Sequence, residues 1–104
     1  MSRIFAYCRV SVDDSTNENQ IEAIKNAGYT IPKTRIIEEV VSGSVAAMER
    51  KEFSNLVTHK LEAGDTLVVL KLDRLGRDCI DLQKTVDMLI AKGIKLICLD
   101  LPVQ

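Results

Sequence analysis

Apolar and polar positions alternate in short blocks along the chain, and the blocks predict strands and helices in regular succession. Strands are expected at residues 3–10, 35–41, 66–70 and 94–99. Thr66–Leu70 is nearly all apolar, which is typical of a strand buried on both faces of a parallel sheet. Turn and capping residues separate these segments at regular intervals, and the chain shows no internal repeat.

Three helices are expected between these strands. The first opens at the capping box Ser15-x-x-Glu18 and ends at Gly28, and the second begins near residue 49. Asp78 can cap the third helix, which ends at Gly93. Their apolar residues recur at helical spacing: Ile21, Ile24 and Ala27; then Phe53, Leu56, Val57 and Leu61, with Lys60 on the same stripe; and finally Ile80, Leu82, Val86, Leu89 and Ile90.

This alternation predicts a three-layer α/β/α domain with a mostly parallel sheet of four or five strands, because right-handed crossovers place helices on both faces of such a sheet. In these folds ligands collect outside the carboxyl ends of the strands. The polar residues that follow the four strands should therefore share one edge of the sheet. They are Arg9 and Ser11, then Ser42-Gly43-Ser44, then Asp73, Arg74 and Arg77, and finally Asp100.

Composition and charge allow one modest globular domain, expected to span residues 1–104. The chain has 46% hydrophobic and 28% charged residues, an ordinary profile that leaves no room for a separate recognition module. Its 14 basic and 15 acidic residues give a formal net charge of -1. The chain lacks the overall basicity of stand-alone nucleic-acid-binding proteins, so local clusters must bind any phosphate.

The cysteines and the N-terminus indicate a cellular compartment. Cys8, Cys79 and Cys98 show no C-x-x-C spacing, and the last two lie in apolar-periodic segments where buried thiols are expected. No apolar run follows basic residues at the N-terminus, and no segment reaches membrane-spanning length. We therefore expect a protein of the reducing cytoplasm, with no targeting signal and no membrane partner.

Two arginine-bearing turns carry the candidate chemistry. Tyr7-Cys8-Arg9-Val10-Ser11 ends the first expected strand, and Leu72-Asp73-Arg74-Leu75-Gly76-Arg77 follows the third. A guanidinium group stays charged near neutral pH and binds two oxygens at once, so a hydroxyl among fixed arginines is a site for a phosphate. Converging arginines would repel one another unless an anion is bound. These residues favour phosphoryl transfer, with DNA as the expected substrate.

Each of these residues also has an ordinary structural role. Ser11 could be a turn hydroxyl or a helix cap, Asp73 could accept hydrogen bonds from the amides of its own turn, and Gly76 could permit a positive φ. Arg74 or Arg77 alone would be a solvated charge. Only the combination, from two turns that meet at one sheet edge, favours a functional site.

Spacing excludes several other chemistries. The single histidine, His59, lies in an expected helix away from both turns, so no Ser-His-Asp relay is indicated, and we expect it at the surface. The chain has no G-x-x-x-x-G-K-[ST] loop, no G-x-G-x-x-G turn and no Cys-x5-Arg phosphatase motif. No cluster of histidine, cysteine and carboxylates predicts a metal site, and we expect no cofactor.

As a set, these motifs resemble the serine recombinases, the resolvase and invertase family. The resemblance spans most of the chain and rests on Tyr7-x-Arg9-Val10-Ser11, on Ser42-Gly43 leading to Arg50-Lys51, and on Gly64-Asp65 before Lys71-Leu72-Asp73-Arg74-Leu75-Gly76-Arg77. It implies a resolvase-like sheet of strand order 2-1-3-4. It also implies the catalytic domain of a site-specific recombinase that acts on double-stranded DNA.

The resemblance assigns roles to the motif residues. Ser11 is the expected nucleophile, which attacks a DNA phosphodiester to form a 5'-phosphoserine link and free a 3' hydroxyl. Fixed arginines can stabilise the phosphate without a metal, and the covalent link conserves the bond energy, so rejoining needs no ATP. The Ser11 proton passes to Asp73, or is lost because nearby cations lower the Ser11 pKa. The expected site consists of Ser11, Arg9, Arg50, Asp73, Arg74 and Arg77, supported by Tyr7 and Gln20.

Three features differ from the family pattern. The loop between Gly43 and Arg50 looks longer than in small resolvases, which could displace Arg50 from the phosphate in an isolated domain. Ser15 stands where the family often has glutamine. The family also continues into a dimerisation helix and a DNA-binding module. We therefore expect a truncated catalytic domain that binds DNA weakly alone, whereas the full-length protein forms a homodimer and a tetrameric synapse.

Two other classes of function stay open. A catalytically silent homologue, with a structural Ser11, would be a DNA-associated assembly module. A phospho-receiver-like signalling domain is suggested by Asp13-Asp14 and the aspartate after the third strand, although arginines beside Asp73 oppose the Mg²⁺ such a site needs. The sequence identifies neither the DNA target nor whether the outcome is resolution, inversion or transposition.

Overall fold

The computed structural model describes residues 3–10, 18–71 and 75–99. In that part of the chain, four strands form one parallel sheet in the order β2-β1-β3-β4. This confirms the expected strand order, and each expected strand is right to within one residue at either end. The strands are β1 (Ile4–Val10), β2 (Ile36–Val40), β3 (Thr66–Val69) and β4 (Lys95–Cys98).

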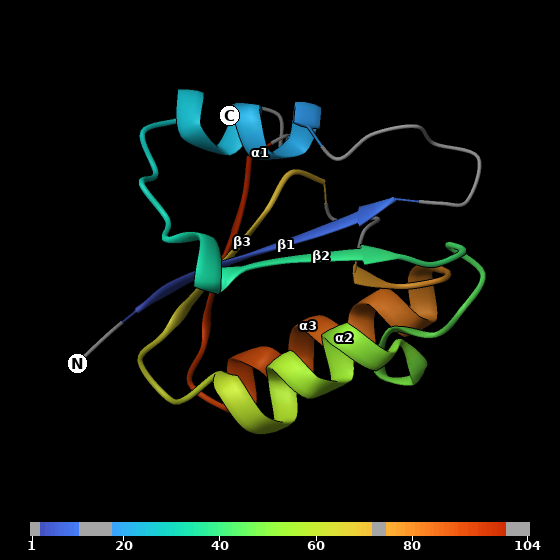
Figure 1. The fold of residues 1–104 in the computed structure, drawn as a ribbon. Helices are drawn as coiled ribbons and strands as arrows, with labels where there is room; N and C mark the ends of the chain where they lie inside the picture. Colours follow the sequence, from blue (N-terminus) through green and yellow to red (C-terminus); the bar gives the residue numbers. More distant parts are fainter. Residues whose placement is uncertain (1–2, 11–17, 72–74, 100–104) are drawn as a thin grey trace, which may run out of the picture.

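Helices cover both faces of the sheet, which confirms the three-layer architecture. Figure 1 shows α1 on one side and α2 with α3 on the other. The helices are α1 (Glu18–Asn26), α2 (Lys51–Asn55) with its π-helical continuation η3 (Leu56–Lys60), and α3 (Cys79–Ala91); η1 (Lys33–Arg35) and η2 (Ala47–Glu49) are single 3₁₀ turns. No helix in the described ranges is both long and apolar enough to cross a membrane.

Local signals explain the helix ends. Asp78 caps α3 as predicted, because its Oδ1 accepts a hydrogen bond from the Asp81 amide at 2.8 Å. Gly28 and Gly93 follow α1 and α3 with φ of +97° and +80°, a conformation that glycine adopts without a Cβ penalty. The predicted cap Ser15 lies outside the described residues.

Strand alternation divides the core between the two faces of the sheet. Phe5 and Tyr7 of β1 point toward α2 and α3, whereas Ala6 and Cys8 belong to the smaller cluster toward α1. The three residues Leu67–Val69 of β3 are fully buried, as predicted for a central strand. The sheet therefore fixes the position of Arg9, which follows Tyr7 by two residues and extends from the same face.

The predicted apolar stripes are wrong at some positions. Ile80 and Ile90 are 69% and 63% exposed, and Ala27 is also exposed. On an α-helix, Ile80 lies about 200° around the axis from Leu82, which packs against the core, so both cannot face the sheet. Thr85 occupies an inward position instead, where its hydroxyl donates a hydrogen bond to the Asp81 carbonyl at 2.8 Å.

The cysteines differ from one another in exposure. Cys8 is buried and Cys98 is half-buried, but Cys79 is exposed, so the expectation of a buried thiol is wrong for Cys79. Burial, with a smaller contribution from the charge of Glu38, raises the pKa of the Cys8 thiol to about 12. His59 is exposed, as predicted.

Gly76 is required by close packing and not by its backbone conformation. Positive φ angles among the described glycines occur only at Gly28, Gly64 and Gly93, so the positive-φ role suggested for Gly76 is wrong. A Cβ atom on Gly76 would lie 2.6 Å from the backbone nitrogen of Leu82 and 2.8 Å from its Cα. The turn that precedes α3 is therefore packed directly onto the first turn of that helix.

Gly76→Ala is expected to destabilise the fold by about 2–4 kcal/mol, because the added methyl group overlaps backbone that cannot rotate away. Urea unfolding of the purified chain would measure this change. Gly28→Ala is the control, because a Cβ atom there would have no neighbouring atom within 4 Å. Only its positive φ should lower the free energy of unfolding, by about 1 kcal/mol. Equal destabilisation by the two variants would contradict the packing argument.

Candidate active site at the carboxyl edge of the sheet

Five of the eight predicted site residues lie in the described part of the chain. They are Tyr7, Arg9, Gln20, Arg50 and Arg77. Ser11, Asp73 and Arg74 lie outside the described residues, as does Asp100. The site can therefore be built from its cationic and supporting side chains.

Arg9 lies near the carboxyl end of β1 and is held against the segment that follows β2. Its Nη1 donates a hydrogen bond to the Val41 carbonyl at 2.8 Å, and only 7% of the residue is exposed. A Cβ atom on Gly43 would lie 3.4 Å from Arg9 Nη2. The absence of a side chain at Gly43 therefore lets the guanidinium lie close to the loop backbone.

Gln20 connects the first helix to the end of β1. Its Nε2 donates a hydrogen bond to the Arg9 carbonyl at 2.9 Å, and the residue is 5% exposed. The contact holds the backbone two residues before Ser11 in the sequence. The supporting role predicted for Gln20 fits this geometry and stays a prediction.

Tyr7 lies beneath Arg9 in the core and donates its hydroxyl hydrogen to Glu39 Oε1 at 2.8 Å. Burial first, and then the hydrogen bond to Glu39, raises the pKa of Tyr7 far above its ordinary value, while the interaction with Arg50 opposes this rise. The phenol therefore stays protonated near neutral pH. Tyr7 can support the site but cannot act as its general base.

Glu39 is a buried residue of the site that the motif analysis missed. Besides the Tyr7 hydroxyl, its carboxylate accepts hydrogen bonds from the backbone amides of Glu52 at 2.8 Å and Phe53 at 3.2 Å. It thereby joins β2 to the first turn of α2, where Arg50 begins the helix. Strand alternation could have predicted this burial, because Glu39 follows the inward-facing Ile37 by two positions. A buried carboxylate needs hydrogen-bond donors around it.

Glu39→Ala is expected to lower the free energy of unfolding by about 3–5 kcal/mol, because one hydroxyl and two amides lose their acceptor in the interior. Urea unfolding would measure the loss. Glu38→Ala, on the exposed side of the same strand, should change stability by less than about 1 kcal/mol. A Glu39→Ala variant as stable as Glu38→Ala would rule out this role.

Arg50 is buried at the start of α2. It is 1% exposed, its Nε donates a hydrogen bond to the Val45 carbonyl at 3.0 Å, and its guanidinium interacts with the Tyr7 hydroxyl. It does not line the hollow that Arg77 lines. The predicted displacement of Arg50 from the phosphate agrees with this burial and stays a prediction.

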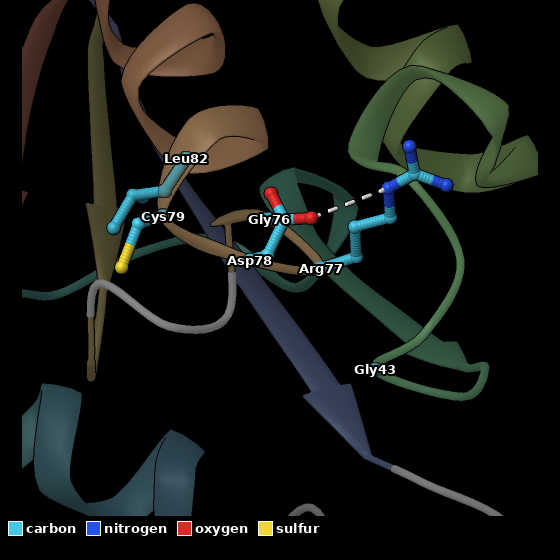
Figure 2. A pocket seen from close by; sticks show the side chains of 6 residues that line it. All are labelled: Gly43, Gly76, Arg77, Asp78, Cys79 and Leu82. Atoms are coloured by element: carbon cyan, nitrogen blue, oxygen red, sulfur yellow. Dashed lines mark ion pairs between the residues drawn. The ribbon is translucent and has the colours of Figure 1, made fainter.

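Arg77 lies beside a hollow of about 260 Å³ at the start of α3. Figure 2 shows the Asp78 carboxylate turned toward the Arg77 guanidinium, with Cys79 on the other side of the turn. The ion pair between Arg77 Nε and Asp78 Oδ2 spans 3.8 Å at an exposed position, so it restrains the arginine only weakly. The hollow is lined by Gly43, Gly76, Arg77, Asp78, Cys79 and Leu82.

Two of the predicted cations, Arg9 and Arg77, lie beside the loop that contains Gly43. A Cβ atom on Gly43 would lie against the Arg9 guanidinium, and Gly43 also lines the hollow beside Arg77, so both arginines border the same loop at the carboxyl edge of the sheet. This confirms the expected shared edge for the polar residues that the structure describes. In the described ranges, no three histidine, cysteine or acidic residues are grouped so that they could hold a metal ion. An anion with several oxygens, such as a phosphate, suits this edge.

Known proteins resemble the chain over nearly its whole length. The family model described as "Resolvase, N terminal domain" matches residues 4–103. The transposon Tn2501 resolvase of Escherichia coli is 52% identical over 101 residues, which cover 97% of this chain and 52% of that protein. Serine recombinase PinR of Escherichia coli (strain K12) is also 52% identical over 101 residues, covering 97% and 51%. The chain thus spans about half the length of these relatives.

Solved structures agree in fold. The N-terminal catalytic domain of TP901-1 integrase is 25% identical, with a TM-score of 0.68 and coverage of 94% of this chain and 77% of that one. A serine recombinase from Sulfolobus solfataricus shares 20% identity at a TM-score of 0.73, covering 100% and 72%. The overall fold is therefore common to all three chains.

Proposed function

We propose that this chain is the catalytic domain of a site-specific DNA recombinase, because it belongs to the serine recombinase family through its resolvase N-terminal domain. The observation that carries the proposal is that Arg9 and Arg77 both border the loop at Gly43, at the carboxyl edge of the sheet. Ser11 follows Arg9 by two positions in the sequence.

In the proposed reaction, Ser11 Oγ attacks the scissile phosphorus in line with the 3' oxygen. The bond from phosphorus to that oxygen breaks, the 3' oxygen leaves with the electron pair and takes a proton from the solvent to become a hydroxyl, and the 5' phosphate stays on the serine. Arg9, Arg50, Arg74 and Arg77 stabilise the negative charge that develops on the phosphate oxygens in the full-length protein. The Ser11 proton passes to Asp73, or it is lost to solvent because nearby cations lower the Ser11 pKa. Rejoining is the same displacement in reverse.

The proposal includes what the longer protein adds. Residues 1–104 act as the catalytic part, and a dimerisation helix and a DNA-binding module complete the protein, which forms a homodimer on double-stranded DNA and a tetramer in the synapse. Two relatives that are about twice as long support this organisation. An exposed Cys79 and no paired cysteine among the described residues support a reducing, cytoplasmic location.

Covalent trapping tests the proposal. The full-length protein that carries this chain is incubated, in the presence of EDTA, with DNA that flanks its own gene, and the mixture is run on a denaturing gel. We expect a protein-DNA adduct attached at a 5' end, with a free 3' hydroxyl on the other fragment. No adduct from a protein that still binds and pairs the DNA would instead support the catalytically silent assembly module.

A further inference from the structure

One carboxylate oxygen joins two segments that are far apart in the sequence. Asp81 Oδ2 accepts hydrogen bonds from the backbone amides of Ala47 and Arg77, each at 2.9 Å. Ala47 begins η2 and lies three residues before Arg50, whereas Arg77 lies just before α3. The same oxygen therefore connects the loop that leads to one predicted phosphate ligand with the backbone of another.

Asp81 is itself held firmly in place. It lies in the first turn of α3, where its amide donates a hydrogen bond to Asp78 Oδ1 at 2.8 Å. A Cβ atom on Gly76 would lie only 3.1 Å from the Asp81 carbonyl carbon, so the preceding turn packs onto this residue. The carboxylate thus extends from a rigid helix end and binds two less regular segments, the one at Ala47 and the one at Arg77.

The charge of Asp81 fits its surroundings. Partial burial of its carboxyl group opposes ionisation, but hydrogen bonds from the Ala47 and Arg77 amides, followed by the charges of Arg77 and Arg50, hold its pKa below the ordinary value. The group is therefore a carboxylate near neutral pH. It offsets part of the repulsion between two arginines that must approach the same phosphate.

We propose that Asp81 is a positioning residue, which fixes the loop before Arg50 onto the start of α3 and so sets the spacing between Arg50 and Arg77 for DNA cleavage. This role rests on the proposed function. Capping of α3 alone would need only the contacts within the helix and its preceding turn, whereas the bond to Ala47 crosses to another part of the chain. The Ala47 contact distinguishes a positioning role from a capping role.

The test compares Asp81→Ala, Asp81→Asn and Thr85→Ala in the full-length protein. Asp81→Ala is expected to slow adduct formation about 10- to 100-fold in single turnover while DNA affinity changes less than about 2-fold, because misplacement of a catalytic group slows the chemical step more than it weakens binding. The Ala47 amide should exchange hydrogen faster in the same variant. Asp81→Asn should restore most of the amide protection and part of the rate, because its side-chain oxygen can still accept.

Thr85→Ala is the matched control for a weakened α3. It removes a buried hydroxyl from the same helix but leaves both contacts of Asp81 Oδ2, so adduct formation should stay within about 3-fold of the wild-type rate. An unchanged rate in Asp81→Ala, or an equal loss in Thr85→Ala at equal stability, would overturn the positioning role alone. No adduct from the wild-type protein would overturn the proposed function, and this role with it.

Discussion

Ser11→Ala in the full-length protein is expected to abolish the covalent protein-DNA adduct, with a loss of cleavage rate on the order of 10⁴-fold or more. The reason is that alanine carries no oxygen to attack phosphorus, and water, which would have to replace it, is not held in line with the leaving group. The measurement is single-turnover cleavage of DNA labelled at each end, resolved on a denaturing gel.

DNA binding separates this loss from a folding defect. Affinity for the same DNA should change less than about 2-fold, because phosphate contacts by the arginines remain. Thr30→Ala, which removes an exposed hydroxyl from the loop after α1, serves as the control and should cleave at the wild-type rate. An adduct that persists in Ser11→Ala would refute the assignment, and the residue attached to DNA would then have to be identified by peptide mapping.

The layer order and strand order were predictable from the sequence because they depend on local periodicity and on short connections. Thr66–Leu70 is apolar on both faces, which predicts a central strand. The cap signals likewise predict that α3 begins after Asp78 and ends before Gly93. Arg9 and Arg77 could likewise be assigned to one edge, because parallel strands place their carboxyl ends together.

The contacts that hold the site together were not predictable in the same way. Glu39 accepts a hydrogen bond from Tyr7, 32 positions away, and Asp81 accepts one from Ala47, 34 positions away. Neither carboxylate belongs to a motif. The sequence suggests only a conformational role for Gly76, whereas the approach of its turn to Leu82 is a tertiary contact that no local pattern encodes. The apolar pattern predicts Ile80 in the core, but helix geometry places it at the surface.

These carboxylates also change the electrostatic argument. The sequence suggested that converging arginines would repel one another unless an anion is bound. In the structure, Asp81 lies within the electrostatic reach of Arg50 and Arg77, and Glu39 shares the Tyr7 hydroxyl with Arg50. Arg50 is therefore held in place before a phosphate arrives, whereas Arg77 is restrained only weakly. Such preorganisation is what makes fixed charges effective in catalysis, because they need not rearrange during the reaction.

Arg50→Lys is expected to reduce the cleavage rate about 10²- to 10³-fold, the usual effect of removing one fixed donor from a charged transition state. Lysine keeps the charge but has no Nε donor for the Val45 carbonyl, and it cannot bind two phosphate oxygens at once. The buried position should make the exchange destabilising by about 1–2 kcal/mol as well. Single-turnover cleavage and urea unfolding, measured on the same preparation, report the two effects separately.

Arg35→Lys is the matched control for Arg50→Lys. Arg35 lies over the Phe5 ring, 6.0 Å from its centroid, in the turn before β2, so the same exchange tests the loss of a guanidinium outside the proposed site. Its cleavage rate should stay within about 2-fold of the wild-type rate. If Arg50→Lys cleaves as fast as Arg35→Lys, Arg50 acts only in the buried network with Tyr7. The phosphate would then be held by the arginines of the two turns alone.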